Sequence, residues 1–300
     1  MKVGLMVGEG SGAAPELKGL VERGQMAEHF GLDTAWIANI ALDGMTAAAA
    51  LGGATSQIEI GTAVVPTFTR HPVAMAQQSA STQMACEGRF TLGIGLAHKF
   101  MVEDMWGLSY DKPAQQMRAY LEILEPALRG VAVTHQSENH DVKLMAMPDG
   151  TDTSVLVAAL GPLMLKIAGR LSGGTITMAT GLKTLETHIV PTITAGAEEA
   201  GRPPPRIVAG FPVLLTANKA EAHDLIAKVF EVYAGVPSYR AMLDREGVSG
   251  VEDVALVGEE VELNAQLERL ESIGVTDLLV MPVETAPGEM ERTIEFLAQR

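Results

Sequence analysis

The segment "IGTAVVPTFTRHPVAMAQQSASTQMACEGRFTLGIG" (Ile60–Gly95) holds two apolar runs joined by a crowded loop and an Ala- and Gln-rich stretch. Apolar runs without polar alternation are typical of strands buried in a parallel sheet. The stretch between them has the composition of a helix. The segment therefore predicts a strand, a loop, a helix and a second strand that ends in Gly-x-Gly.

The same order recurs along the chain eight times, because each apolar run is followed by a helical stretch. Alternating strands and helices indicate a parallel sheet with crossover helices. Eight such units in 300 residues predict a (β/α)8 TIM barrel. Gly31 and Gly274 are expected to end helices in the left-handed conformation. The predicted strands are 2–7, 33–39, 58–65, 89–95, 154–160, 174–180, 206–216 and 276–283.

Two insertions are expected to interrupt a single domain that spans residues 1–300. The first, near 133–153, is polar and turn-rich and predicts a small hairpin before the fifth strand. The second, near 235–262, predicts extra helices that act as a lid over one end of the barrel.

Composition limits the classes of partner. The chain has 22 basic and 37 acidic residues, a net charge of −15, and such a surface repels both nucleic acid and anionic membrane. Cys86 is the single cysteine, so an intrachain disulfide is impossible and a cytoplasmic location is expected. The sequence has neither the pattern of a signal peptide nor an apolar run of the ~18 residues that a membrane span needs.

Two motifs favour ordinary structure over function. Gly8–Ala13 fits G-x-G-x-x-A after the first strand, but the second strand ends at Asn39 without the carboxylate that binds a ribose, so we predict a barrel-mouth loop. His135–Asp141 has no metal-ligand spacing and predicts a solvated turn, with no metal site. The histidines in polar helical contexts are expected on the surface: His29, His188 and His223.

Five polar residues follow the carboxyl ends of predicted strands, on the face where barrel active sites form: Glu9, Asn39, Arg70, His71 and His98. Arg70 and His71 are expected to cap and pack the helix that follows them. Glu9 and His98 are expected to face a pocket.

The junction from Ala158 to Gly169 offers a possible anion site. A buried strand ends at Gly161, and Pro162 takes the first helical position. The free N–H groups and partial positive charge of a helix start can hold a phosphate without a lysine. The residues alone favour neither an anion site nor an ordinary strand–helix junction.

The segment from Thr69 to Gly95 resembles the luciferase-like monooxygenase superfamily, whose members are (β/α)8 barrels that bind FMN or coenzyme F420. The resemblance rests on His71–Pro72, on Gly88-Arg89-Phe90 and on Gly93-Ile94-Gly95. Three further segments resemble the branch that uses coenzyme F420: "ALGPLMLKIAGRLSGGT", "VPSYRAMLDREG" and "LVGEEVELNAQLERLESIGVTDLLV".

The resemblance implies a non-prolyl cis peptide at Ala63–Val64 that backs the cofactor ring. It implies a phosphate site at Ala158-Ala159-Leu160-Gly161-Pro162, and it adds Gly95, Thr180 and Gly181 to the cofactor site. Leu96 stands where the FMN branch has an arginine, which favours coenzyme F420 over FMN. Asn39–Ile40 replaces the Asp-His pair of some dehydrogenases, which favours reduction of an acceptor.

We therefore expect a coenzyme F420-dependent oxidoreductase that transfers a hydride between C5 of the deazaflavin and a small organic substrate. Glu9, His98 and Asn39 form the expected catalytic set, with the proton coming from Glu9, His98 or water. The alternatives are an FMN monooxygenase and a flavin-binding protein without catalysis. The family also implies a homodimer that pairs through the second and third units.

Overall fold

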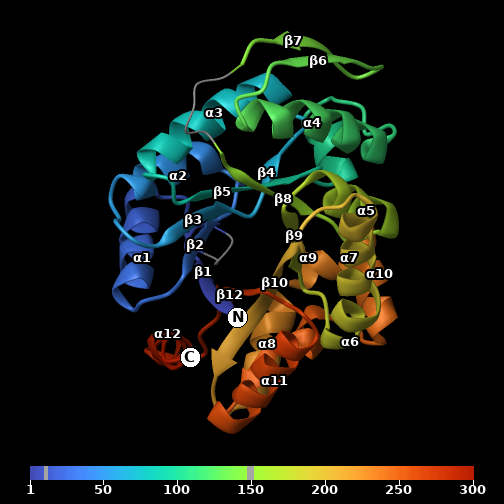
Figure 1. Ribbon diagram of the computed structural model, residues 1–300. Coiled ribbons are helices and arrows are strands. Elements are labelled where there is room, and N and C mark those ends of the chain that lie inside the picture. The colour runs from blue at the N-terminus through green and yellow to red at the C-terminus, as the bar shows by residue number, and fades with distance from the viewer. Residues whose placement is uncertain (10–12, 147–151) are drawn as a thin grey trace.

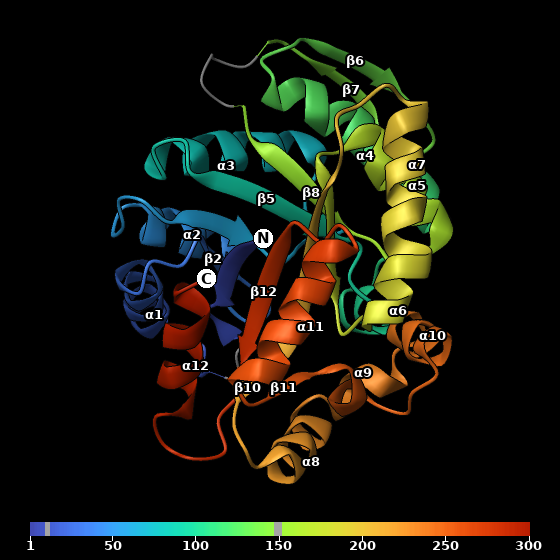
Figure 2. The ribbon, with the colours of Figure 1, turned by 60° about the horizontal axis from the view of Figure 1, so that its bottom comes forward.

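The computed structural model describes residues 1–9, 13–146 and 152–300, and its core is a closed barrel of eight parallel strands (Figures 1 and 2). Each strand pairs with the next along the chain, and the last pairs with the first. The predicted barrel is therefore confirmed. Its strands are β1 Lys2–Met6, β2 Thr34–Ile37, β3 Glu59–Thr62, β5 Phe90–Gly95, β8 Ser154–Ala158, β9 Gly174–Met178, β10 Arg206–Leu215 and β12 Asp277–Pro282.

Helices surround the barrel (Figure 2). They are α1 Leu17–His29, α2 Gly44–Gly52, α3 Pro72–Ala85, α4 Pro113–Leu128, α5 Pro162–Leu171, α6 Leu182–Thr184, α7 Val190–Glu199, α8 Lys219–Val229, α9 Glu231–Gly235, α10 Pro237–Glu246, α11 Glu260–Ser272 and α12 Glu289–Ala298. Other helical segments of the described residues include two π-helical turns, Met101–Met105 and Leu185–Ile189, and a 3₁₀ turn, Val251–Val254. Gly31 and Gly274 follow the ends of α1 and α11 with φ of 81° and 97°, as expected.

The two segments expected to be insertions contain additional elements. β6 (Val133–Gln136) and β7 (Asp141–Leu144) form an antiparallel hairpin beside α4 (Figure 1). The second segment contains α10 and the short strand β11 (Leu256–Gly258), which pairs with the end of β10. Sequence reasoning missed β11, because three apolar residues carry too little periodicity to separate a strand from a loop.

Trp36 fills the barrel between two glycines of the neighbouring strands. A Cβ added at Gly4 of β1 would lie 2.4 Å from Trp36 Nε1, and one added at Gly61 of β3 would lie 2.2 Å from its Cζ3. The ring is fully buried. Larger residues at these two positions would therefore displace the ring, so the glycines are required by packing.

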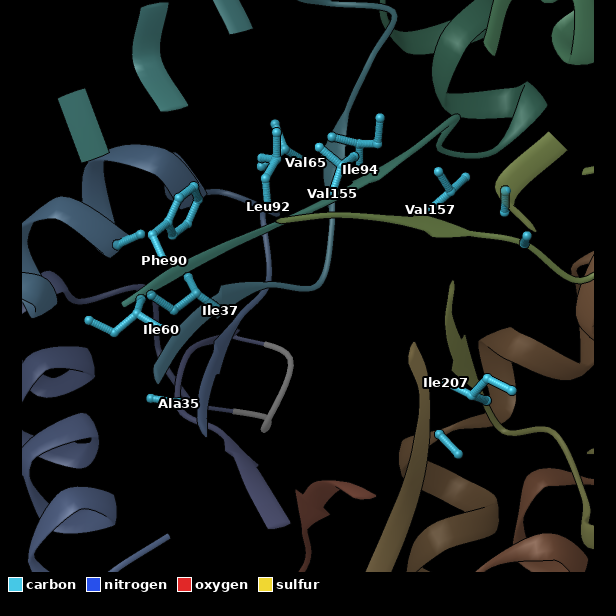
Figure 3. Packing of buried hydrophobic residues seen from close by; sticks show 14 of the residues in the cluster. Ala35, Ile37, Ile60, Val65, Phe90, Leu92, Ile94, Val155, Val157 and Ile207 are labelled. Carbon is cyan, nitrogen blue, oxygen red and sulfur yellow. The ribbon is translucent and has the colours of Figure 1, made fainter. Parts of the chain in front are cut away.

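Alternate residues of the strands belong to two different apolar clusters, as expected when both faces of a sheet are covered. Ala35 and Ile37 pack with helix residues in the cluster of Figure 3, whereas Trp36 between them belongs to the second cluster. The same alternation separates Val157 from Leu156 on β8. Aliphatic residues dominate both layers, in agreement with the low aromatic content of 4%.

Charged side chains close the barrel at the amino ends of its strands. Arg206 at the start of β10 donates to Glu59 of β3 at 2.5 Å and also to Asp277 of β12. Burial by itself would raise the pKa of Glu59, but the hydrogen bonds and charge of Arg206 outweigh it and lower that pKa to about 2. The network joins three strands at the end of the barrel opposite the site described below.

Candidate functional site

Two adjoining cavities lie at the carboxyl ends of the strands. The inner cavity, about 350 Å³, is bounded by the last residues of three strands: Gly95, Ala158 and Met178. The outer cavity, about 870 Å³, lies between the Met101–Met105 turn and the α9–α10 region. The two share four lining residues: Ala97, His98, Tyr110 and Ser238.

One wall of the inner cavity is the bulge after β3. The peptide bond between Ala63 and Val64 is cis, as the resemblance implied, and both residues line the cavity. The chain then returns to the barrel as β4 (Val65–Pro66), which pairs with β5. A Cβ added at Gly95 would lie 2.6 Å from Val64 Cγ2, so glycine at this position preserves the shape of the wall.

The opposite wall is the start of α5. The first helical hydrogen bond runs from Leu165 N–H to the Gly161 carbonyl, and no side chain caps the helix. The N–H groups of the first turn therefore have no acceptor inside the helix. A Cβ added at Gly161 would meet no atom within 4 Å, which leaves open space beside these donors. Apolar walls for a ring and a free helix start for a phosphate fit a flavin-type cofactor.

His188 contacts the chain just before this turn, and the expectation that it is a surface residue is wrong. The side chain is 6% exposed, and its Nε2 donates to the carbonyl oxygen of Leu160 at 2.8 Å. The polar sequence around it misled the prediction, because the π-helical turn Leu185–Ile189 buries His188 together with Leu185 and Ile189.

Glu9 and Asn39 lie near the barrel mouth but line neither cavity. The Glu9 carboxylate accepts hydrogen bonds from the N–H groups of Ala41 (3.0 Å) and Leu42 (2.8 Å). Asn39 Oδ1 accepts from Gly44 N–H at 2.9 Å, at the start of α2. Both side chains thus hold the loop after β2. Gly10 and the next two residues of the glycine motif lie outside the described residues.

Thr180 and Gly181 also lie outside the cavity walls. The Thr180 hydroxyl donates to the Met178 carbonyl at 3.3 Å. A Cβ added at Gly181 would lie 2.1 Å from the carboxyl carbon of Glu246, which packs from α10 onto the start of α6. Thr180 thus contacts the end of β9 and Gly181 lies against α10, and neither residue lines the inner cavity.

His98 lines both cavities. It follows Ala97, whose left-handed backbone (φ 56°) turns the chain sharply after β5. The His98 ring lies 5.7 Å from that of Tyr239 and 6.0 Å from that of Phe100. Burial lowers the pKa of His98 below 6.5, so the imidazole is neutral at pH 7.

Two tyrosines of the inner cavity were missed by sequence reasoning. Tyr110 and Tyr239 both line it, and burial raises the pKa of each phenol. Both hydroxyls therefore remain protonated at neutral pH. The signal was present for Tyr239, because it lies in the segment "VPSYRAMLDREG" that carries part of the resemblance.

Arg70 and His71 have the packing roles that were expected. His71 caps α3 by accepting from Val73 N–H at 3.3 Å, and Arg70 pairs with Asp43. Cys86 is buried in the core, where burial raises the pKa of its thiol to about 11. Within residues 1–9, 13–146 and 152–300 no cluster of side chains is suited to a metal ion, and no helix could cross a membrane.

A pocket at the carboxyl ends of eight parallel strands is the arrangement of (β/α)8 barrel enzymes. Comparison with protein families then makes the classification specific. The chain belongs to the luciferase-like monooxygenase family, whose model matches residues 1–277. The resemblance seen in the sequence is thereby confirmed.

Relatives include a 5,10-methylenetetrahydromethanopterin reductase from Methanolobus tindarius, 29% identical over 242 residues, which covers 78% of this chain and 72% of the relative. A coenzyme F420-dependent glucose-6-phosphate dehydrogenase from Microbacterium testaceum is 28% identical over 200 residues, with 61% and 59% covered.

Solved structures share the fold. The coenzyme F420-dependent tetrahydromethanopterin reductase of Methanopyrus kandleri superposes with a TM-score of 0.79 at 22% identity and covers 99% of this chain and 97% of that one. The oxygenating constituent of 3,6-diketocamphane monooxygenase from Pseudomonas putida, in complex with FMN, gives the same TM-score at 18% identity, with 100% and 97% covered.

Proposed function

We propose that this protein is a coenzyme F420-dependent oxidoreductase that reduces a small organic substrate. The observation that carries the proposal is the inner cavity, where the Ala63–Val64 bulge faces a helix start with unpaired N–H groups. The names of the relatives support the choice of cofactor, because two of them are coenzyme F420-dependent enzymes.

Different residues of the inner cavity would bind different parts of the cofactor. Ala63, Val64 and Gly95 would lie against the ring system of the cofactor, and the turn from Ala158 to Pro162 would hold its phosphate through backbone N–H groups. No lysine or arginine is among the described residues that line this cavity. When bound, the deazaflavin supplies a hydride at its C5 position.

His98 is the group we assign to proton transfer. Of the three residues expected to form the catalytic set, it is the one that lines the cavities, whereas the carboxylate of Glu9 is held by backbone N–H groups. The neighbouring rings of Phe100 and Tyr239 restrict its orientation. Protonated His98 would donate to the substrate during reduction, and neutral His98 would accept during oxidation.

An FMN monooxygenase is the second candidate, because the FMN complex from Pseudomonas putida superposes as well as the coenzyme F420-dependent reductase does. Leu96 lines the inner cavity where the FMN branch has an arginine, which favours the first candidate. A flavin-binding protein without catalysis would bind cofactor and turn over no acceptor.

The deciding experiment is a pair of fluorescence titrations of purified protein with coenzyme F420 and with FMN. Saturable binding at micromolar concentration or tighter for the deazaflavin, and none for FMN, is the expected result. Oxygen consumption with reduced FMN would instead support the monooxygenase. Reduced coenzyme F420 is then mixed with candidate acceptors, and a failure to oxidise it with any of them would favour the non-catalytic alternative.

We further infer a single-domain chain that works in the cytoplasm as a homodimer paired through α2 and α3. Exposed apolar side chains near these helices support the pairing: Met84 is 56% exposed and Ile40 is 65% exposed. Light scattering after gel filtration tests it, and Met84→Glu should shift the mass toward that of a monomer.

A further inference from the structure

The outer cavity holds more negative than positive charge. Glu103, Asp104 and Glu231 are among its lining residues, and Lys99 is the single lysine or arginine among the described ones. Lys99 Nζ lies 3.7 Å from Glu103 Oε2. Three carboxylates against one ammonium leave two negative charges, on Asp104 and Glu231, that no cationic side chain of the cavity offsets.

The remaining wall is apolar and partly aromatic. Phe100 and Val232 are 48% and 64% exposed, although both are large hydrophobic side chains. Val236, Pro237 and the ring of Tyr110 continue the same surface. Exposed apolar side chains gathered around a concave site are typical of a ligand-binding surface.

The position of the outer cavity connects it to the proposed chemistry. Because Ala97, His98, Tyr110 and Ser238 belong to both cavities, a molecule in the outer one lies beside the inner one. His98 contributes no positive charge at neutral pH, since burial favours its neutral form. The outer cavity therefore offers an anionic group one cationic side chain among its described lining residues, Lys99, which already lies beside Glu103.

We propose that the substrate is an apolar molecule that is uncharged or cationic, and that Asp104 and Glu231 exclude anionic esters from the outer cavity. An anion brought beside two unpaired carboxylates is repelled, whereas a cation is attracted to them. To call this ligand a substrate rests on the proposed function, but the ligand preference of the outer cavity can be measured without cofactor.

The test uses three probes of similar size, phenyltrimethylammonium, benzyl alcohol and phenyl phosphate, titrated into the full chain by ligand-detected NMR. Saturating inorganic phosphate is present throughout, so that the helix-start site of the inner cavity is occupied and the probes report on the outer cavity. The dissociation constant of the cation should be about tenfold lower than that of phenyl phosphate, with benzyl alcohol between them. In Asp104→Asn/Glu231→Gln the two constants should come within about threefold of each other.

The matched control is Glu198→Gln/Glu268→Gln, which changes the net charge equally at two exposed residues that line neither cavity. It should keep the tenfold preference. Raising the salt concentration from 50 to 500 mM should narrow the preference in the unmodified protein, because the charges are screened. This salt series tests the inference even if a variant does not fold.

Two results would overturn the inference: equal or tighter binding of phenyl phosphate, or the same loss of preference in the control variant. The coenzyme F420 titration is run alongside. Binding of the cofactor without charge preference would reject this inference alone, and charge preference without cofactor binding would reject the proposed function alone.

Discussion

His188 Nε2 donates a hydrogen bond to the Leu160 carbonyl oxygen across 2.8 Å, and this contact joins the π-helical turn Leu185–Ile189 to the turn after β8. A carbonyl oxygen accepts only, so Nε2 of His188 carries a proton. The contact is made one residue before Gly161, the N-cap of α5, where the helix presents its free N–H groups. His188 therefore acts on the proposed phosphate site as a positioning residue.

Replacing His188 by Leu should weaken coenzyme F420 binding about tenfold, because one hydrogen bond of ~1–1.5 kcal/mol holds the turn in place. The kcat at saturating cofactor should change little. His188→Gln, which keeps a donor, should recover part of the affinity. Thr187→Ala, at an exposed neighbour, is the control, and equal losses in both variants would argue against a specific role for His188.

Gly161→Ala should fold normally and bind the cofactor poorly. Its backbone (φ −75°, ψ 151°) is accessible to alanine, and the added Cβ meets no protein atom within 4 Å. The methyl group would therefore occupy the space proposed for the phosphate, and we expect at least a tenfold rise in Kd by fluorescence titration, with Tm unchanged. Gly53→Ala, at another unstrained helix end, serves as control. Unimpaired binding by Gly161→Ala would place the phosphate elsewhere.

The rate of acceptor reduction should depend on the protonation of His98. Because burial lowers its pKa below 6.5, the protonated donor is depleted as the pH rises through that lowered value. The single-turnover rate should therefore fall from acid toward neutral pH, and His98→Asn should be slow and pH-independent over this range. His29→Asn, on the exposed end of α1, should keep the profile. An unchanged profile in His98→Asn would transfer the role to water or to another group.

Glu59 should make the barrel sensitive to acid. Its pKa is about 2 in the folded protein against 4.5 when unperturbed, so its contribution is complete above pH 4.5 and is lost as the pH falls toward 2. The shift corresponds to about 3 kcal/mol of unfolding free energy.

In urea denaturation, Glu59→Gln should lose about 2–3 kcal/mol at pH 7, and the difference from the unmodified protein should shrink as the pH approaches 2. Glu268→Gln should change little at either pH, because its side chain is exposed. A constant difference at all pH values would mean that the pKa of Glu59 is not shifted by Arg206.

The eight barrel strands could be read from the sequence because each is a continuous apolar run followed by a helical stretch. The helix ends at Gly31 and Gly274 were equally local, since a left-handed residue needs glycine at that point. β11 was not predicted, because its three residues become a strand only by pairing with the end of β10.

The candidate site likewise combines residues that sequence order predicts with residues that it does not predict. His98 and the Ala158–Pro162 turn were found because they follow the carboxyl ends of strands, a position that sequence order defines. Tyr110 and Tyr239 reach the same cavity from segments outside the strand–helix period. Glu9 occupies the expected position, yet its carboxylate is held by the loop after β2.

The sequence by itself determined the barrel, its order of strands and the face that carries the site, because apolar periodicity and glycine placement act over a few neighbouring residues. The tertiary structure alone decided the direction of each side chain and its partner, including the burial of His188 and the unpaired charge of Asp104 and Glu231. Those properties depend on contacts between residues far apart in the chain, whose geometry is set only when the barrel closes.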